Sequence, residues 1–470
     1  MIAMTLQEIA DAVGGTILSP TLDSNTVFSG SAETDSRLVT QGSIFFAMPG
    51  EETDGHRFID AAIANGAALL ICEEHVSTST PAIRVDSGAE ALAQLAKTVV
   101  ARVRAAGELA VVGITGSNGK TTTKSMLQAI LEHHGETVSP VKSFNNHIGA
   151  PMTMLRVTEQ TKYLVLELGA SGKGEIAKLV ALVKPDVGVV LKVGLAHAGE
   201  FGGVEATQAA KRELVTPLTA EDVAILNRDD ARVFAMKDDT AAAVRTFGLD
   251  AQSTLWASEI ESSIDGTSFE LHGQWASKPL ESRVVRLQIL GDHHVMNALA
   301  ALSAADALGI DLDSAIASLE ALPLAERGRM ELMHASRWTV INDAYNASPD
   351  SMAAALKSLA HIARGAGRRS VAVLGEMSEL GEYSFEEHDR IGLLAVRLNI
   401  DKLVVVGVAA RQIHNAAERE GSYDAESVFV EDAEAARRFL DTALRDNDLI
   451  LVKSSNSAGL QSLGDEIGAL

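Results

Sequence analysis

The stretch VVGITGSNGKTTT, residues 111–123, places an apolar run directly before two glycines, a lysine and three threonines. A strand, a glycine loop and a helix in this order form a phosphate site, because loop N–H groups and the helix dipole point to one place. Lys120 would reach the β- and γ-phosphates, and the Thr121 hydroxyl would reach Mg²⁺. Ile114 stands where the usual motif has its first glycine, so the motif is a shorter Gly-x-x-Gly-Lys-Thr from Gly116. We expect a nucleoside triphosphate here; the alternative is a glycine turn before an ordinary helix.

The chain around this loop alternates apolar strands with helices. The segments that predict buried strands are LAVVGIT (109–115), YLVLELG (163–169), DVGVVLKVG (186–194) and DVAILN (222–227). Helices are predicted at KTTTKSMLQAILEHH (120–134) and HHVMNALAALSAADALG (293–309), and β-hairpins at 254–290. Such alternation is typical of a parallel sheet that is covered on both faces.

Two further units flank this centre. In the first, SIFFAM (43–48) and AALLIC (67–72) predict strands and ALAQLAKTVVARVRAAG (91–107) a closing helix. In the last, WTVINDAY (338–345), SVAVLGEM (370–377), KLVVVGVA (402–409) and DLILVKSS (448–455) resume the α/β alternation. We therefore expect an α/β protein of three domains: a small mixed domain (1–107), a P-loop ATPase-like parallel-sheet domain (108–325) and a Rossmann-like domain (326–470).

Composition limits the partners and the compartment. The 40 basic and 63 acidic residues give a formal charge of −23, which argues against a nucleic-acid or anionic membrane partner. Cys72 is the only cysteine, so no disulfide can form within the chain, as expected in a reducing cytosol. The start, MIAMTLQEIADAVGG, lacks the basic region of a signal peptide, and no apolar run approaches the ~20 residues of a membrane span. We expect a cytoplasmic protein.

Two strands of the central unit end in residues that suit phosphate chemistry. Glu167 lies at the end of the apolar strand predicted in 163–169, and His197 follows the next strand along the chain. In open α/β sheets, ligands bind at the carboxyl ends of the strands, so these side chains should meet Thr121 there. Such a set can hold two Mg²⁺ ions around a transferring phosphoryl group. Because imidazole is an unusual Mg²⁺ ligand, a histidine that only caps a loop is the alternative for His197.

The chain resembles a known family over nearly its whole length. The matching segments, in order, are GITGSNGKTTTK, SFNNHIGAPMTML, LELGASGKGEI, HAGEFGGVEATQAAKREL, GDHHVMNALAAL, RGRMEL, NDAYNASPDSM and GEMSELGE. This set is similar to the Mur ligase family, the ATP-dependent amino-acid and peptide ligases of bacterial peptidoglycan synthesis. The resemblance implies an amide ligase that activates a carboxylate as an acyl phosphate, with the third domain closing on the second.

Two segments resemble the family member that adds D-alanyl-D-alanine to UDP-N-acetylmuramoyl-tripeptide. YNASPDSM has Ser348 where that member has asparagine, and GEMSELG has Glu376 where it has aspartate. The Asp-Asn-Pro-Arg motif of the sibling that adds diaminopimelate is absent. The C-terminal LVKSSNSAGL resembles the family's Val-Lys-Gly-Ser-Arg segment, but Ser454 and Asn456 replace its glycine and arginine, so we assign it no ligand contact.

The resemblance implies roles for individual residues. Lys120 would bind the β- and γ-phosphates, Thr121 and Glu167 one Mg²⁺, and His197 a second. Lys211, which by itself reads as a solvated helix residue, matches a lysine that is carbamylated and bridges or orients Mg²⁺. The implied catalytic residues are Lys120, Glu167, His197 and Lys211. The implied ATP-binding residues are Gly116, Ser117, Asn118, Gly119, Lys120, Thr121, Thr122, Asn145, Asn146, Asn297 (at the adenine), Arg329 and Asp343.

The resemblance also implies where the UDP-linked substrate binds. The segment ETDSRLVTQGSIFFAMPGEETDGHRFI (33–59) matches the family's uridine-nucleotide segment. Ser36 and Arg37 would contact the UDP moiety, since a guanidinium pairs with phosphate oxygens. The sugar–peptide part would contact Asp54, Gly55 and His56. The third domain would contribute Tyr345 and Asn346 and bind the incoming dipeptide. Without the resemblance, this segment reads as a turn and a surface histidine.

Other readings of the sequence remain open. They are a sibling ligase that adds a single amino acid, a ligase like folylpolyglutamate synthase, and a nucleotide-dependent switch without ligase activity. The histidine pairs His133–His134 and His293–His294 could be metal ligands, but we interpret the first pair as helix surface and the second as a helix entry. We expect a monomer.

Overall fold

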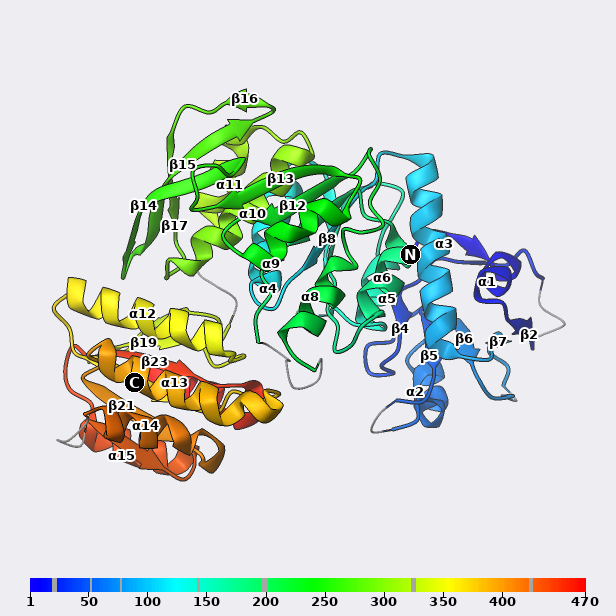
Figure 1. The fold of residues 1–470 in the computed structure, drawn as a ribbon. Helices are drawn as coiled ribbons and strands as arrows, with labels where there is room; N and C mark the ends of the chain where they lie inside the picture. Colours follow the sequence, from blue (N-terminus) through cyan, green and yellow to red (C-terminus); the bar gives the residue numbers. More distant parts are fainter. Residues whose placement is uncertain are drawn as a thin grey trace.

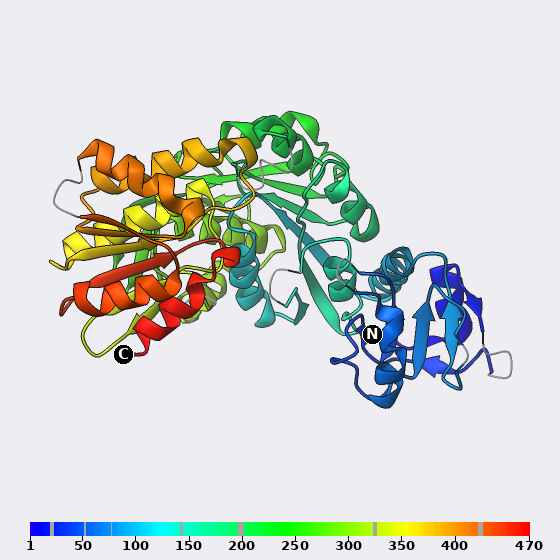
Figure 2. The same ribbon diagram turned by 90° about the horizontal axis from the view of Figure 1, so that it is seen from below.

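The computed structural model of the chain describes residues 1–18, 23–50, 53–76, 78–141, 144–195, 202–322, 327–421 and 426–470. The strands of these residues form five-, ten- and six-stranded sheets and one two-stranded pair. Figures 1 and 2 show three lobes in chain order, with the blue first lobe at one end and the orange and red last lobe at the other. The predicted α/β class is confirmed. The domain limits stay a prediction, and residue 325 lies outside the described residues.

The first lobe is a small sheet with the strand order β2-β7-β6-β5-β4. Its strands are β2 (Thr16–Ile17), β4 (Ala32–Glu33), β5 (Ile44–Ala47), β6 (Leu69–Cys72) and β7 (Ala82–Arg84), and β1 (Met4–Thr5) pairs with β3 (Val27–Phe28). Its helices are α1 (Leu6–Val13), the 3₁₀ turn η1 (Gly55–Phe58), α2 (Ile59–Ala64) and α3 (Gly88–Ala106). The three elements predicted for this lobe are present as β5, β6 and α3.

The central lobe has the strand order β16-β15-β14-β13-β12-β11-β8-β10-β9, with β17 paired to β15. Its strands are β8 (Ala110–Thr115), β9 (Glu136–Val138), β10 (Thr161–Glu167), β11 (Val187–Val190), β12 (Val223–Asn227), β13 (Ala243–Gly248), β14 (Leu255–Ser263), β15 (Gly266–Trp275), β16 (Lys278–Pro279) and β17 (Arg283–Leu287). Its helices are α4 (Lys120–Glu132), α5 (Gly149–Met154), α6 (Glu175–Val183), α8 (Val204–Arg212), α9 (Ala231–Phe234), α10 (His293–Ala307) and α11 (Leu312–Ala321), with the 3₁₀ turn η2 (Ala235–Asp239). Strands β9 to β13 pair in parallel, and β14 to β17 form the predicted hairpins.

Both faces of the central sheet are buried. Successive residues of β8 point to opposite faces, so Val111 packs in one apolar cluster with α3, α5 and α6, and Val112 in another with α4, α10 and α11. Burial on both sides explains why these strands are apolar along their length rather than alternating. Because α3 belongs to the first lobe and packs against α5 and α6, the first two lobes share one core.

The last lobe has the strand order β18-β19-β23-β20-β21-β22. Its strands are β18 (Glu331–His334), β19 (Thr339–Asn342), β20 (Ser370–Leu374), β21 (Lys402–Val406), β22 (Ser427–Val430) and β23 (Leu449–Lys453). Its helices are α12 (Pro349–Gly365), α13 (Ser384–Arg397), α14 (Arg411–Glu420), α15 (Ala433–Ala443) and α16 (Leu460–Gly468), with short 3₁₀ turns at Gly381–Tyr383, Val408–Ala410 and Asn456–Ala458. Every pair except β18–β19 is parallel. Helix α12 packs against β14 and so joins this lobe to the central one.

None of the helices within the described ranges combines the length and the apolar character that crossing a bilayer would take.

Candidate active site

A cavity of about 1080 Å³ lies between the central and last lobes. The central lobe lines it with the loop after β8, with Glu167 at the end of β10 and with the first turns of α10. The last lobe lines it with Arg329, with Asp343, Tyr345 and Asn346 after β19, and with Lys453 at the end of β23. Carboxyl ends of parallel strands from two sheets therefore face the same space, the position at which α/β sheets bind ligands.

The loop between β8 and α4 requires its glycines. Gly119 has a φ of +86° and precedes the first turn of α4, and a Cβ there would lie 2.4 Å from Oδ1 of Asn297. A Cβ on Gly116, whose φ is +156°, would lie 2.9 Å from Cβ of Leu191. A side chain at either position would therefore push the loop away from α10 or from the residues after β11.

The side chains of the loop hold its shape. The Ser117 hydroxyl donates to the Gly194 carbonyl (3.2 Å) and accepts from the Gly194 N–H (2.9 Å). The Lys120 ammonium donates to the carbonyl of Gly116 at 2.6 Å, which keeps it folded over the loop. Burial lowers the pKa of Lys120, and the nearby Glu167 carboxylate opposes that effect.

Thr121, Glu167 and Arg329 come together from three distant parts of the chain. The Thr121 hydroxyl donates to Oε2 of Glu167 at 3.2 Å, and an Arg329 N–H donates to the Thr121 hydroxyl at 3.4 Å. Glu167 is fully buried, and its Oε1 has no hydrogen-bond partner among the described residues. Burial raises the pKa of Glu167, although Lys120, Lys124 and Arg329 oppose this.

This arrangement fits a divalent cation. A buried carboxylate oxygen without a partner, beside a hydroxyl, offers the hard oxygen donors that Mg²⁺ takes. His197, the other predicted metal ligand, lies outside the described residues. Within the described ranges, no three His, Cys, Asp or Glu side chains gather as a metal site, so any cation here would also need water or phosphate oxygens.

Lys211 lies in the last turn of α8, close enough to Lys120 for the charge of Lys120 to act on it. Its side chain is buried rather than solvated. Burial, followed by the charge of Lys120, lowers the pKa of Lys211 to about 7. At neutral pH a large share of the amine is therefore uncharged, which is the form that can react with CO₂.

The last lobe contributes Arg329, Asp343 and Lys453 to the cavity, and Lys453 and Asp343 are joined to each other. The Lys453 ammonium, which is buried, donates to Oδ2 of Asp343 (2.6 Å) and to the carbonyl of Asn346 (2.9 Å). Asp343 also accepts from the N–H of Met330 at 3.1 Å. The Arg329 guanidinium lies 4.2 Å from the centre of the Tyr345 ring, so the aromatic face orients it. Lys453 was not predicted as a site residue. The signal that could have identified it is the resemblance of LVKSSNSAGL to the family's Val-Lys-Gly-Ser-Arg segment, in which Lys453 matches the lysine.

A hydrogen bond joins the two lobes at the phosphate loop. The Ser348 hydroxyl caps α12 and donates to Oδ1 of Asn118 at 2.9 Å. With Oδ1 held, the Asn118 Nδ2 is a buried donor without a partner among the described residues. An ion pair between Lys192 and Asp350 (3.1 Å) lies on the same side. Sequence reasoning noted Ser348 only as a departure from the family and missed this contact.

The two predicted asparagines after β9 differ in position. Asn145 lines the cavity, and its amide lies against Gly169. Asn146 is exposed, does not line the cavity, and uses its Oδ1 to accept from the N–H groups of Ile148 (3.2 Å) and Gly149 (2.8 Å) at the start of α5. Of the other predicted ATP residues, Thr122 and Asn297 line the cavity.

The predicted substrate residues of the first lobe lie outside this cavity. The Arg37 side chain is 85% exposed and pairs with Asp35, whose pKa this contact lowers. Both ring nitrogens of His56 are engaged, one with Asp54 (2.7 Å) and the other as acceptor from the N–H of Glu73 (3.0 Å). Ser36 is buried. Gly55 packs closely against the chain, since a Cβ there would lie 2.7 Å from the carbonyl oxygen of Met48.

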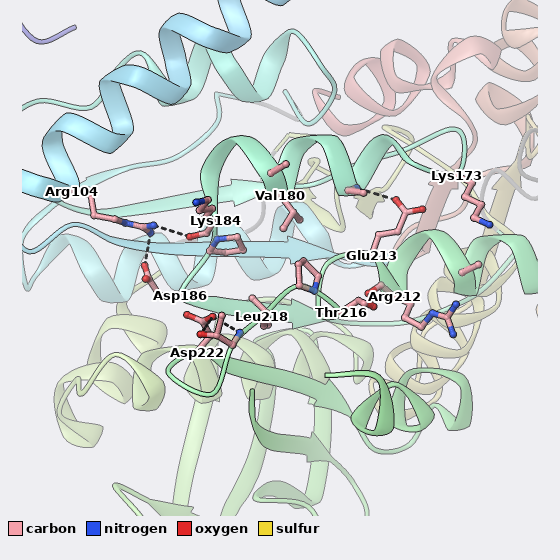
Figure 3. Close-up of a pocket in the computed structure, with 16 residues that line it drawn as sticks. Arg104, Lys173, Val180, Lys184, Asp186, Arg212, Glu213, Thr216, Leu218 and Asp222 are labelled. Atoms are coloured by element: carbon pink, nitrogen blue, oxygen red, sulfur yellow. Dashed lines mark hydrogen bonds and ion pairs between the residues drawn. The ribbon is translucent and has the colours of Figure 1, made fainter. Parts of the chain in front are cut away.

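A second cavity, of about 760 Å³, lies between α6 and α8, beside the residues that precede β11 and β12 (Figure 3). Asp186 accepts there from Arg104 (2.8 Å) and from the N–H of Val111 (2.7 Å). Glu213 accepts from two N–H groups at the start of α6, at 2.7 and 3.0 Å. None of the predicted site residues lines this cavity. Its acidic side chains Asp186 and Glu213 accept hydrogen bonds from backbone N–H groups at the start of β8 and of α6.

Three family descriptions match the chain in order. Residues 31–100 match the description "Mur ligase family, catalytic domain", residues 114–305 "Mur ligase middle domain", and residues 328–456 "Mur ligase, glutamate ligase domain". A curated relative from Mycobacterium tuberculosis, named UDP-N-acetylmuramoyl-tripeptide–D-alanyl-D-alanine ligase, is 42% identical over 100% of this chain and 98% of its own length.

Two solved structures extend the likeness to three dimensions. The crystal structure of MurF from Acinetobacter baumannii superposes with a TM-score of 0.88 at 30% identity, and covers 99% of each chain. The structure of MurF ligase from Thermotoga maritima in complex with ADP gives a TM-score of 0.80 at 27% identity, with 94% of this chain and 97% of that chain covered.

Proposed function

This chain belongs to the Mur ligase family and is an ATP-dependent ligase, and from that premise we propose that it joins D-alanyl-D-alanine to UDP-N-acetylmuramoyl-tripeptide. ATP is converted to ADP and phosphate in the process. The observation that carries this proposal is the meeting of Thr121 and Glu167 with Arg329. A phosphate loop, a buried acid and a guanidinium from another lobe form a site for phosphoryl transfer from ATP.

The chemistry requires an activated carboxylate. The terminal carboxylate of the tripeptide attacks the γ-phosphorus of ATP, and ADP leaves, so that an acyl phosphate forms. The amine of D-alanyl-D-alanine then attacks the acyl carbon, and phosphate leaves as the amide forms. An α-amine titrates near ~8, so part of it is uncharged at cellular pH.

The cationic side chains stabilise the phosphoryl transfer. Lys120 would turn from the Gly116 carbonyl to the β- and γ-phosphates, and Arg329 would donate to the transferring group. Fixed donors that face developing charge supply most of the rate enhancement in such reactions. Mg²⁺, when bound, would neutralise phosphate charge; Thr121 and Glu167 would hold one ion, and His197 and Lys211 would serve a second.

Lys211 would act as a carbamate. The buried amine, with a pKa of about 7, supports this role, because an uncharged amine reacts with CO₂ and the product is an anion. Such an anion would suit a place beside Lys120 and the metal ions. The remaining ATP contacts would come from Gly116, Ser117, Asn118, Gly119, Thr122, Asn145, Asn146, Asn297 and Asp343.

The peptide substrates would bind on either side of this centre. Ser36 and Arg37 would contact the UDP moiety, and Asp54, Gly55 and His56 the sugar–peptide part. Tyr345 and Asn346 would face the reacting end, and the last lobe would receive the dipeptide. The protein would act as a cytoplasmic monomer, and the last lobe would move toward the central lobe to keep water from the acyl phosphate.

The experiment is phosphate release from ATP with UDP-N-acetylmuramoyl-tripeptide present. Release that requires D-alanyl-D-alanine, with a product heavier by one dipeptide residue, supports the proposal. Release with free lysine, diaminopimelate or glutamate would move the assignment to a sibling ligase. Absence of stimulation by any acceptor would refute the ligase reading and favour a nucleotide-dependent switch.

A further inference from the structure

The segment that leads into β18 turns sharply on either side of Arg329. Gly328 has a φ of +74° and Met330 a φ of +52°, so both adopt the left-handed conformation. Glycine takes this conformation at little cost, but a residue with a side chain does so only where its surroundings hold it. Met330 is 2% exposed and packs in the apolar cluster of the last lobe. The direction in which Arg329 leaves the chain therefore depends on the contacts that hold this turn.

The chain after β19 holds the turn from both sides. The N–H of Met330 donates to Oδ1 of Asp343 at 3.1 Å. The N–H of Tyr345 donates to the carbonyl of Gly328 at 3.0 Å. These two bonds fix the residues before and after Arg329 to the carboxyl end of β19.

Lys453 in turn holds Asp343. Its ammonium lies at the end of β23, the strand beside β19, and donates to Oδ2 of Asp343 at 2.6 Å and to the carbonyl of Asn346 at 2.9 Å. The Lys453 side chain is 2% exposed and that of Asp343 14%, so this charge-assisted hydrogen bond is shielded from water and correspondingly strong. With Oδ2 fixed by Lys453, the other carboxylate oxygen is held toward the N–H of Met330.

The Arg329 side chain reaches from this turn to the central lobe. Its guanidinium lies 4.2 Å from the centre of the Tyr345 ring, and one N–H donates to the Thr121 hydroxyl at 3.4 Å. Thr121 is in the first turn of α4, directly after Lys120. The N–H donors of a guanidinium lie in one plane, so their direction determines whether they meet a phosphate group. A displacement of the turn would therefore move the guanidinium away from the phosphate loop.

We infer that Lys453 is a positioning residue for Arg329: by fixing Asp343 it holds the left-handed turn at Met330, and this turn aims the guanidinium at the phosphate loop. Lys453 acts without touching the nucleotide itself. The inference rests on the proposed function only in taking the cavity as the ATP site and Arg329 as a ligand of its terminal phosphate.

The test compares binding of ADP with binding of the non-hydrolysable analogue AMP-PNP, which keeps the third phosphate group. Arg329→Met should lower the ratio of the AMP-PNP affinity to the ADP affinity by about 10- to 50-fold, the size of a charge-assisted hydrogen bond. Lys453→Met should lower the same ratio by at least about fivefold, although Arg329 is present. The double variant should match Arg329→Met within about twofold, because Lys453 acts through Arg329. Affinities are measured by calorimetry on the full chain with Mg²⁺ and without the peptide substrates.

A second ion pair of the last lobe provides the matched control. Arg369 donates to Asp448 at 2.7 Å, and the Asp448 side chain is 1% exposed. This pair lies at the amino ends of β20 and β23, opposite to the end that carries Lys453. Arg369→Met should lower the midpoint of thermal unfolding, as the loss of a buried partner does, but leave the ratio of the two affinities unchanged.

Loss of Lys453 alone leaves the Asp343 charge without its partner, which can prevent folding. The combined change Lys453→Met with Asp343→Asn removes both charges and avoids this problem. The amide oxygen at position 343 can still accept from Met330, but no ammonium holds it, so the ratio should again fall by at least about threefold. Any contact of Asp343 with a part that both nucleotides share cancels in this ratio.

Hydrogen exchange examines the turn without a nucleotide. The Met330 amide should exchange at least about tenfold faster in Lys453→Met than in the wild type, and at the wild-type rate in Arg369→Met. Three results would overturn the inference: an unchanged ratio in Lys453→Met, losses that multiply in the double variant, and unchanged exchange at Met330. Because no ligation is measured, these results leave the proposed ligase activity untouched, and a failed ligase assay leaves this test intact.

Discussion

The nucleotide cavity and the predicted UDP-binding segment of the first lobe differ in how their polar groups are satisfied. In the cavity, buried atoms of Asn118, Glu167 and His294 have no partner among the described residues. In the first lobe, Arg37 and His56 are already paired, each with an acid two residues earlier in the chain. The cavity is therefore chemically incomplete without a ligand, whereas the first-lobe segment is complete.

This difference in hydrogen bonding determines how strongly each region constrains its ligand. A buried atom without a partner has few places to find one, so its position limits which ligand group it can meet. A paired side chain at the surface must exchange its present partner or water for the ligand, and the gain is correspondingly small. We therefore expect substitutions in the cavity to act strongly and those in the first-lobe segment weakly.

The largest effect should come from Lys120→Met. Loss of the cation that would face the β- and γ-phosphates should lower kcat/KM for ATP by at least about 10³-fold, since fixed charges dominate phosphoryl transfer. The measurement is phosphate release with both peptide substrates. Thermal unfolding should be little changed, because among the described residues the ammonium donates to the carbonyl of Gly116 in its own loop. Activity within tenfold of the wild type would contradict the assigned role.

Glu167→Gln should lower turnover by about 10²- to 10³-fold, because the replacement keeps the shape but removes the negative charge that would hold Mg²⁺. The apparent affinity for Mg²⁺, obtained from turnover at varied concentration, should fall as well. Thr123→Val, which removes a hydroxyl further along α4 that contacts Asn297, serves as the control and should leave Mg²⁺ dependence unchanged. Equal Mg²⁺ dependence in wild type and Glu167→Gln would refute the metal assignment.

Lys211→Met should lower turnover by about 10- to 100-fold, the range seen when groups that support a metal site are removed. Its pH dependence gives a sharper test. The pKa of Lys211 is lowered to about 7, so the amine is mainly uncharged above pH 7 and protonated below it. With ¹³C-bicarbonate, a carbamate signal should be present at pH 8 and fade as the pH falls through about 7.

The control for this signal is the Lys211→Met protein, which should lack it at every pH. An ordinary exposed lysine would form a carbamate only at much higher pH. A wild-type protein without the signal between pH 6 and 9 would rule out the carbamate and leave Lys211 as a buried amine.

Ser348→Ala should raise the KM for ATP by about three- to tenfold, because Asn118 loses the hydroxyl that orients its amide. The same change removes the helix cap of α12 and should lower the free energy of unfolding by about 1 kcal/mol. Ser351→Ala is the matched control, since it removes the other half of this capping box but leaves the bond to Asn118 intact. An equal rise in KM for both variants would mean that the cap, not the contact between lobes, is responsible.

The smallest effect should come from Arg37→Ala. Its exposed pair with Asp35 should leave unfolding unchanged, and KM should rise only for the UDP-linked substrate, by about three- to tenfold. Kinetics at saturating ATP measure this. Arg57→Ala, a change at another exposed cation of the first lobe that was given no role, is the control. A rise in the KM for ATP, or no change in either constant, would remove Arg37 from the UDP site.

Several features followed from the sequence because they depend on local pattern. The phosphate loop was readable because Gly116 and Gly119 need backbone freedom at fixed spacing from Lys120. The central strands were readable because burial on both faces demands uninterrupted apolar residues. The edge strands β9 and β18, and β13 inside the central sheet, were not predicted, since a few residues of mixed character carry no clear periodicity.

Other site residues were beyond local pattern. The sequence alone made Lys211 a solvated helix residue, because a single lysine on a helix says nothing about what covers it. Lys453 and Ser348 acquired their contacts only when β23 and α12 met residues more than a hundred positions away. His294 was read as a helix entry, which is correct, but its lack of a partner depends on packing around α10.

The sequence by itself thus determined the phosphate loop, the α/β class and where along the chain the apolar parallel strands lie. Each of these depends on residues that are close together in the chain. Only the tertiary structure decided which charges are buried, which polar atoms lack partners among the described residues and that Arg329 meets Thr121. The physical reason is that burial and pKa are properties of a residue's surroundings. In this cavity those surroundings come from segments up to 230 positions apart, as in the bond between Ser348 and Asn118.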